Sequence, residues 1–239
     1  MAVDSIRSES PRPTPLAPWW HTALLVTLFV GLAAGGAAFQ RGATSDPAAL
    51  RGHPHVAPLY LSMILMEWGL VLYVWRGGLR RSGVPLRDLV GARGSSARSW
   101  LVDAALAAAL WGVWALVSRG WERVFGPDHA ASIGSLLPQG PLEVSLWVAL
   151  SLSAGFCEEL VFRGYLQRQF TVLTRSAAVA WLLQSALFGI SHGYQGAAAC
   201  AKIAVYGALF GALAMWRRSL RPGMLAHAAT DILAGLFCV

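Results

Sequence analysis

A group of six ionisable residues stands out inside the strongly apolar segments of this sequence. They are Glu158, Glu159, Arg163, His192, His227 and Asp231. A charged side chain at the centre of a membrane helix costs about 2.5–3.5 kcal/mol on insertion scales, so such residues are rare there and mark functional sites. They fall in three apolar windows, at 144–171, 176–192 and 223–237. The sequence therefore predicts a polar site that three helices build inside a membrane.

The spacing of Glu158, Glu159 and Arg163 predicts a different role for each glutamate. Glu159 and Arg163 are four residues apart with the acid first, the order that favours an ion pair on one helix face. Glu158 then lies about 100° around the helix and is free to face another group. We expect Glu159 and Arg163 to support the site and Glu158 to act in it.

The other two windows repeat the same four-residue spacing. Phe188 and His192 form one pair, and His227 and Asp231 form the other. Each pair projects from one face of its helix. Three helices thus each offer a polar or aromatic pair to a common interior.

These three patterns, EExxxR at 158–163, FxxxH at 188–192 and HxxxD at 227–231, occur in the order known from one family. They resemble the CPBP family of intramembrane endopeptidases (CAAX protease and bacteriocin-processing, also called Abi), which includes the type II CAAX prenyl endopeptidase. The resemblance covers roughly residues 142–239. It implies a membrane-embedded protease that acts on membrane-associated proteins or peptides, by CAAX-type cleavage, peptide maturation or removal of C-terminal sorting tails.

The resemblance also implies roles for the individual side chains. Glu158 and His192 match the pair thought to activate a water, whereas His227 and Asp231 match the pair assigned to the oxyanion. The remaining motif residues, Glu159, Arg163 and Phe188, would support them.

Asp231 departs from the family pattern, which has Asn at this position. An Asn side chain can donate a hydrogen bond to an oxyanion, whereas an ionised Asp can only accept one. Three roles follow for Asp231: a protonated donor, a carboxylate that orients His227, or a metal ligand. We expect the orienting role.

The need for a metal is open at the level of sequence. Glu158, His192 and His227 could bind zinc and leave a fourth coordination position free, as in metallopeptidases. The helix motif HExxH of zinc peptidases is absent from the sequence. We therefore favour a glutamate-activated water without a metal.

The whole chain has the composition of a polytopic membrane protein. Of 239 residues, 56% are hydrophobic and 13% charged, about half the charged share of soluble domains. The seven apolar windows predict an all-α transmembrane bundle of about seven spans. They lie near 22–39, 57–75, 100–117, 144–171, 176–192, 197–216 and 223–237. The predicted organisation is a disordered cytoplasmic arm at 1–18, N-terminal membrane helices at 19–141 and a catalytic membrane core at 142–239.

The arginines predict the orientation of the chain. With a cytoplasmic N-terminus, thirteen arginines fall in cytoplasmic segments and four outside, which is a strong positive-inside bias. The loop 76–98 is then cytoplasmic, and the loops 40–56 and 118–141 are not. The net charge of +7 is thus explained by the topology of the chain, without a nucleic-acid partner. We expect the protein to lie in the cytoplasmic (inner) membrane of a bacterial-type cell.

Other buried polar residues predict structure and not chemistry. We expect Glu67 and Asp103 to make structural contacts, Lys202 to reach a span end, and Cys157 to be a small packed residue. Two rival functions remain from other classes: an ion-coupled transporter, and a non-enzymatic immunity or binding protein on a protease frame.

The depths of the predicted site residues conflict in a simple up-and-down bundle. Glu158 and His192 are level if the chain turns near residue 175, but His227 lies only about 9 Å beyond the start of the last span. The sixth span must therefore be short, tilted or broken, and Gly193, Gly196 and Pro222-Gly223 are the candidate places.

Overall fold

The computed structural model describes residues 14–44, 56–91, 96–126 and 136–237. Throughout these ranges every regular element is a helix. The α-helices and the two π segments, η2 and η3, are α1 (Trp19–Thr44), α2 (Ala57–Val74), η2 (Trp75–Leu79), α3 (Leu86–Val90), α4 (Ala97–Phe125), α6 (Pro141–Glu158), η3 (Glu159–Leu166), α7 (Gln167–Thr174), α8 (Ala177–Ser191), α9 (Ala197–Arg217) and α10 (Arg221–Phe237). A short 3-10 turn, η4 (Gly193–Gln195), joins α8 to α9. The predicted all-α class is confirmed.

All seven apolar windows of the sequence fall on helices. In the described residues, five helical stretches are long and apolar enough to cross a membrane: Trp19–Ala38, Ala57–Leu79, Ala97–Phe125, Pro141–Thr174 and Ala197–Arg217. The other two windows give shorter helices, α8 with 15 residues and α10 with 17. The protein is an integral, multi-pass membrane protein.

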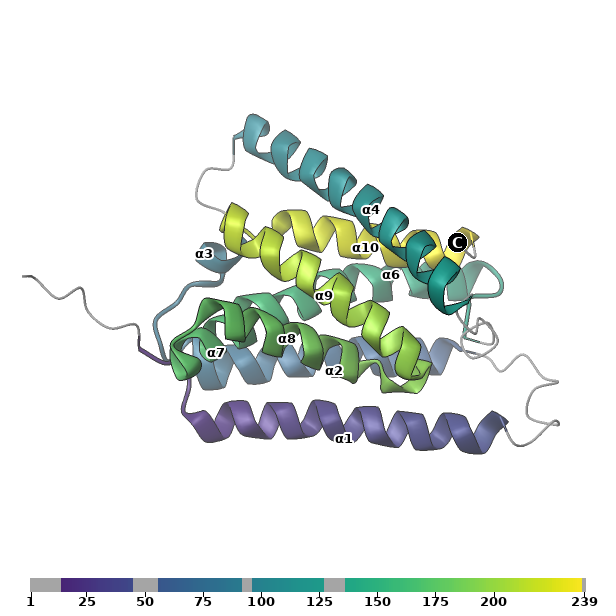
Figure 1. Cartoon of the computed structure of the whole chain (residues 1–239), viewed down its shortest axis with the longest axis horizontal. Coiled ribbons are helices and arrows are strands. Elements are labelled where there is room, and N and C mark those ends of the chain that lie inside the picture. The colour runs from purple at the N-terminus through teal and green to yellow at the C-terminus, as the bar shows by residue number, and fades with distance from the viewer. Residues whose placement is uncertain (1–13, 45–55, 92–95, 127–135, 238–239) are drawn as a thin grey trace, which may run out of the picture.

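Local signals in the sequence explain where several helices begin and end. The hydroxyls of Ser96 and Ser176 accept hydrogen bonds from the third residue beyond them and so cap α4 and α8. Arg175 and Arg218 adopt left-handed backbone angles that end α7 and α9. These two turns return the chain at the same end of the bundle (Figure 1).

The helices run roughly side by side, with α1 along one edge of the bundle and α4 along the opposite edge (Figure 1). The predicted conflict of depths is resolved by tilt, because α9 is an unbroken helix that crosses the bundle obliquely (Figure 1). Close packing at glycines permits this course. A Cβ atom on Gly189 of α8 would lie 2.3 Å from the carbonyl oxygen of Cys200 on α9.

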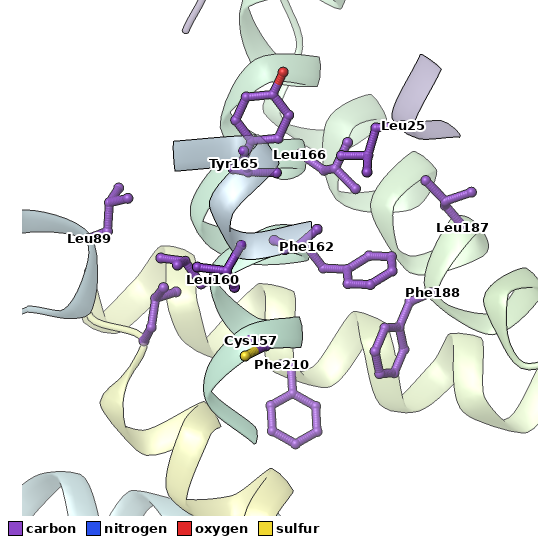
Figure 2. Packing of buried hydrophobic residues seen from close by; sticks show 14 of the residues in the cluster. Leu25, Leu89, Cys157, Leu160, Phe162, Tyr165, Leu166, Leu187, Phe188 and Phe210 are labelled. Atoms are coloured by element: carbon purple, nitrogen blue, oxygen red, sulfur yellow. The ribbon is translucent and has the colours of Figure 1, made fainter. Parts of the chain in front are cut away.

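The hydrophobic core surrounds the π segment η3. The fully buried side chains of Leu160, Phe162 and Tyr165 point into it from η3. Figure 2 shows Phe162 and Phe188 facing each other, with ring centroids 5.0 Å apart in an edge-on arrangement. Cys157 packs in the same core and is 1% exposed, so the prediction of a small packed residue is confirmed. Two of the motif residues, Glu159 and Arg163, therefore lie in a segment that is buried throughout.

Residues 1–13 of the predicted arm lie outside the described residues. At its end, Leu16 and Ala17 are held by the buried amide of Gln169 on α7. The Gln169 oxygen accepts from both backbone N–H groups, and its nitrogen donates to the Ala17 carbonyl at 2.6 Å. The entry into α1 is thus fixed to α7.

Candidate active site

The ion pair between Glu159 and Arg163 is the structural centre of the site. Arg163 Nη1 lies 2.8 Å from Glu159 Oε1, and both side chains are completely buried. Arg163 Nη2 also donates to the carbonyl of Gly207 on α9, at 3.1 Å. A Cβ atom on Gly207 would lie 3.4 Å from that same nitrogen. The pair therefore ties η3 to α9, and it requires close approach of the two helices.

The helix changes its winding between the two glutamates. α6 ends at Glu158, and the wider π segment η3 begins at Glu159, with the backbone N–H of Gln167 bonded to Phe162 five residues before it. Insertions of this kind frequently accompany functional sites. Here Glu159 points into the core with Arg163, whereas Glu158 keeps 23% of its side chain exposed.

His227 of α10 lies among three carboxyl groups. Its Nδ1 is 3.3 Å from Glu159 Oε1, within hydrogen-bond distance. Its Nε2 is 3.8 Å from Glu158 Oε2 and 3.6 Å from Asp231 Oδ2, which are ion-pair distances but too long for hydrogen bonds. The imidazole is thus held at Nδ1 by Glu159, and its other nitrogen faces the two remaining acids.

Aromatic rings enclose this imidazole. The rings of Phe188, Tyr206 and Phe210 lie with centroids 5.9, 6.0 and 5.5 Å from that of His227. Phe188 also packs under the Arg163 guanidinium, 4.3 Å from its ring centroid. The FxxxH phenylalanine therefore contacts both the ion pair and His227, which explains a supporting role without chemistry of its own.

Glu158 and His192 line one cavity of about 450 Å³. His192 follows α8 directly, and its Nδ1 lies 2.9 Å from the carbonyl oxygen of Phe188. A carbonyl oxygen only accepts, so Nδ1 carries the hydrogen and Nε2 of the neutral ring keeps its lone pair. A neutral imidazole held in this way has its Nε2 available to accept a hydrogen bond.

Glu67 of α2 also lines this cavity, whereas the sequence alone predicts only a structural role for it. Its side chain is 5% exposed, and its Oε2 has no hydrogen-bond partner among the described residues. The signal in the sequence is a carboxylate in the middle of an apolar span, which marks a functional site in membranes. Glu67 therefore places a second carboxyl group in the cavity that Glu158 and His192 line.

The other intramembrane charges make structural contacts, as expected. Asp103 of α4 binds Arg217 at 2.9 Å and Arg221 at 2.7 Å. Lys202 near the start of α9 pairs with Glu122 at 3.3 Å. These pairs join α4 to α9 and α10.

The donor groups of the site suit zinc chemically, since imidazole nitrogens and carboxylate oxygens are its common ligands. Within the part of the chain that the structure describes, however, no three His, Cys, Asp or Glu side chains converge as a preformed metal site. The possible binding of a metal ion by Glu158, His192 and His227 therefore stays a prediction.

The fold and the site together define a polytopic helical membrane protein with a buried cluster of acids and histidines. Residues 140–233 match the family model of the Rce1-like proteins, described as type II CAAX prenyl endopeptidase Rce1-like. No curated protein and no solved structure gave a match. The resemblance predicted from the three motifs is confirmed for this stretch, which includes all seven motif residues named above, from Glu158 to Asp231. The match supports protease activity of the CAAX type in general, and Glu67 lies outside it.

Proposed function

We propose that this protein is an intramembrane endopeptidase that hydrolyses peptide bonds with a water activated by Glu158 and His192. The observation that carries the proposal is the position of Glu158. Its side chain faces the cavity that His192 lines, and its Oε2 also lies 3.8 Å from the imidazole of His227. The Glu158 carboxylate thus lies between His192, which can act as a base, and His227, which can donate a hydrogen bond.

The proposed reaction follows from this arrangement. Water in the cavity loses a proton to Glu158, with the bare Nε2 of His192 accepting a hydrogen bond, and its oxygen adds to the scissile carbonyl. His227 stabilises the oxyanion from its Nε2 side. When the C–N bond breaks, the proton on Glu158 passes to the leaving amine, so the carboxylate is regenerated.

The ion pair has a separate task in this proposal. Arg163 holds Glu159 in place, and Glu159 accepts a hydrogen bond from His227 Nδ1 and so fixes the ring plane. Asp231 lies on the Nε2 side of His227, where it favours a hydrogen on that nitrogen. Asp231 therefore acts on the orientation and protonation of His227, in keeping with the role expected from the sequence.

The cavity walls point to an apolar substrate. Leu59, Met63, Met66, Val161 and Phe162 are among its lining residues, and Leu59 and Met66 are partly exposed on the outside of the bundle. We infer that a hydrophobic or lipidated segment of a membrane-associated protein or peptide enters from the lipid side, beside α1 and α2.

The proposed mechanism requires no metal, and removal of metals tests this directly. We expect the purified protein to keep its activity after dialysis against a chelator. Loss of activity that added zinc restores would contradict the metal-free mechanism.

We also propose that the protein lies in a bacterial-type cytoplasmic membrane with its N-terminus in the cytoplasm. The turns before α8 and before α10 carry arginines and lie at one end of the bundle, next to α3 and the start of α1 (Figure 1). All these segments belong to the side that the arginine distribution assigns to the cytoplasm.

The decisive experiment is cleavage of membrane-protein substrates by purified variants. Glu158→Gln and His192→Ala should each lower the cleavage rate by about 10²–10⁴-fold, the usual contribution of a general base. Both should fold like the wild type, because Glu158 and His192 are partly exposed in the cavity. Arg119→Gln, which removes an exposed charge on α4 away from the cavity, is the control.

The outcomes separate the proposed activity from its rivals. Near-wild-type cleavage by Glu158→Gln would refute the mechanism. A wild-type protein that never cleaves, but forms a tight complex with a partner, would instead favour the binding protein. Mass spectrometry of membrane-protein termini, with and without this protein, identifies the substrate.

A further inference from the structure

A second cavity, of about 650 Å³, lies away from the Glu158–His192 cavity. Its lining includes residues of α3, α7, α9 and the start of α10. We call it the arginine cavity because five arginines line it, namely Arg163, Arg168, Arg217, Arg218 and Arg221. Such a density of guanidinium groups suits an anion with several oxygens.

The arginine cavity is preorganised. Asp103 and Ser99 of α4 hold Arg217 and Arg221, with Nη2 of Arg221 2.9 Å from the Ser99 hydroxyl and 2.7 Å from Asp103. Arg221 also stacks on Trp100, 4.6 Å from its ring centroid. The guanidinium groups therefore lose little further freedom when a ligand binds.

Two buried donors on arginines that line this cavity lack acceptors among the described residues. Nε of Arg221 and Nε of Arg163 have no hydrogen-bond partner among the described residues, and these arginines are only 4% and 2% exposed. Buried N–H donors are nearly always paired, with protein groups, water or a bound molecule. An anion in the cavity would supply acceptors to both side chains.

The charges around the cavity leave it positive. Glu159 balances Arg163, and Asp103 is shared by Arg217 and Arg221. Among the described lining residues, Asp88 alone carries a negative charge that offsets the arginines. Arg168 and Arg218, both exposed, supply further positive charge at the mouth.

The place of the cavity identifies the anion. Its lining includes Gly91 at the end of α3, Ala177 at the start of α8 and Arg218 at the end of α9, all on the side that the sequence assigns to the cytoplasm. Basic pockets between membrane helices on this side are suited to the headgroups of anionic lipids. We propose that the arginine cavity binds the phosphate of an anionic phospholipid headgroup.

This proposal does not depend on the protease activity. It nevertheless links the two regions, because Arg163 lines the arginine cavity and also holds Glu159.

The test measures lipid binding and not cleavage. The full-length protein is purified from vesicles of phosphatidylcholine mixed with phosphatidylglycerol, and the retained lipid is identified by native mass spectrometry. We expect retention of phosphatidylglycerol, and about tenfold weaker retention in the double variant Arg168→Gln/Arg218→Gln, the scale of a lost charged hydrogen bond. The matched control is Arg119→Gln/Arg123→Gln, which removes two exposed arginines from the other end of α4 and should retain the lipid like the wild type.

Three outcomes would overturn the proposal. They are equal retention of phosphatidylcholine and phosphatidylglycerol, equal loss in both double variants, and binding of inorganic phosphate as tight as that of the lipid. The salt dependence of wild-type retention checks the charge contribution without any variant, and binding that is unchanged at high salt would also count against it.

Discussion

Removal of the Arg163 side chain should destabilise the fold, because it breaks a buried ion pair from one side. The fully buried carboxyl group of Glu159 would lose its partner at 2.8 Å. Breaking a buried ion pair from one side costs about 3–5 kcal/mol. Arg163→Ala should therefore lower both the folded yield and the thermal transition, measured in the same lipid or detergent as the wild type.

Arg168 offers the matched control for this prediction, since it is an exposed arginine five residues along the same helix. Arg168→Ala should change the stability by less than about 1 kcal/mol. A well-folded Arg163→Ala protein with an unchanged transition would contradict the structural role of the ion pair.

Asp231 tests how the site replaces the Asn of the family pattern. Its carboxylate lies 3.6 Å from His227 Nε2 and is one-third exposed at 34%. Asp231→Asn should keep substantial activity, because the amide oxygen can still accept from the imidazole, whereas Asp231→Ala should lose most of it. Cleavage assays of both variants, each with and without a chelator, measure this. An inactive Asn variant that added zinc rescues would show a metal ligand instead.

For single residues, the sequence predicts contacts within one helix but not contacts between helices. The Glu159–Arg163 pair follows from four-residue spacing, and the structure contains it at 2.8 Å. The bond between Glu159 and His227 joins residues 68 positions apart, and no periodicity encodes it. The place of Glu67 in the cavity is missed for the same reason, because its neighbours there come from α6 and the end of α8.

Helix packing around Gly155 brings His227 to the glutamates. A Cβ atom on Gly155 of α6 would lie 2.8 Å from the carbonyl oxygen of Met224 and 2.9 Å from the backbone nitrogen of Ala228, both on α10. Gly155→Ala should therefore push α10 away from η3 and lower the cleavage rate by at least about tenfold. The same change at Gly112 of α4, where a Cβ atom would meet no neighbour within 4 Å among the described residues, should leave the rate unchanged.

The second half of this prediction is structural. Cysteine crosslinking between α6 and α10 should become slower in Gly155→Ala but not in Gly112→Ala. Equal rates of cleavage and crosslinking in the two variants would contradict the role of close packing.

The helices themselves are predictable from the sequence, and their tilts are not. Apolar windows locate every membrane helix because lipid demands long runs of apolar side chains. The oblique course of α9 depends instead on particular contacts, such as Gly189 against the Cys200 carbonyl and Gly207 against Phe188. The π segment at Glu159 is likewise not marked in the sequence, because the apolar window 144–171 runs straight through it.

For the whole molecule, the distribution of arginines makes a definite prediction of topology. Position 87, whose side chain is 78% exposed, should be cytoplasmic, and position 123 at the far end of α4 should not. Single cysteines at these positions, in a background with the three native cysteines replaced by alanine, can be labelled with an impermeant maleimide. We expect position 123 to react in intact cells and position 87 only after permeabilisation.

The two positions serve as controls for each other. Labelling of position 87 in intact cells, with position 123 protected, would invert the assignment of every loop. It would also move the arginine cavity to the opposite leaflet.

The shortness of α8 has a consequence for the membrane itself. Its 15 residues span about 22 Å, whereas the hydrocarbon layer is about 30 Å thick. Such hydrophobic mismatch is met by local thinning of the bilayer, which draws the aqueous surface inward. His192 directly follows this helix, so the thinned patch shortens the route by which water reaches the cavity. Lipids with longer acyl chains should oppose the thinning, and the thickness of the surrounding membrane thereby becomes a determinant of how fast bonds are cut.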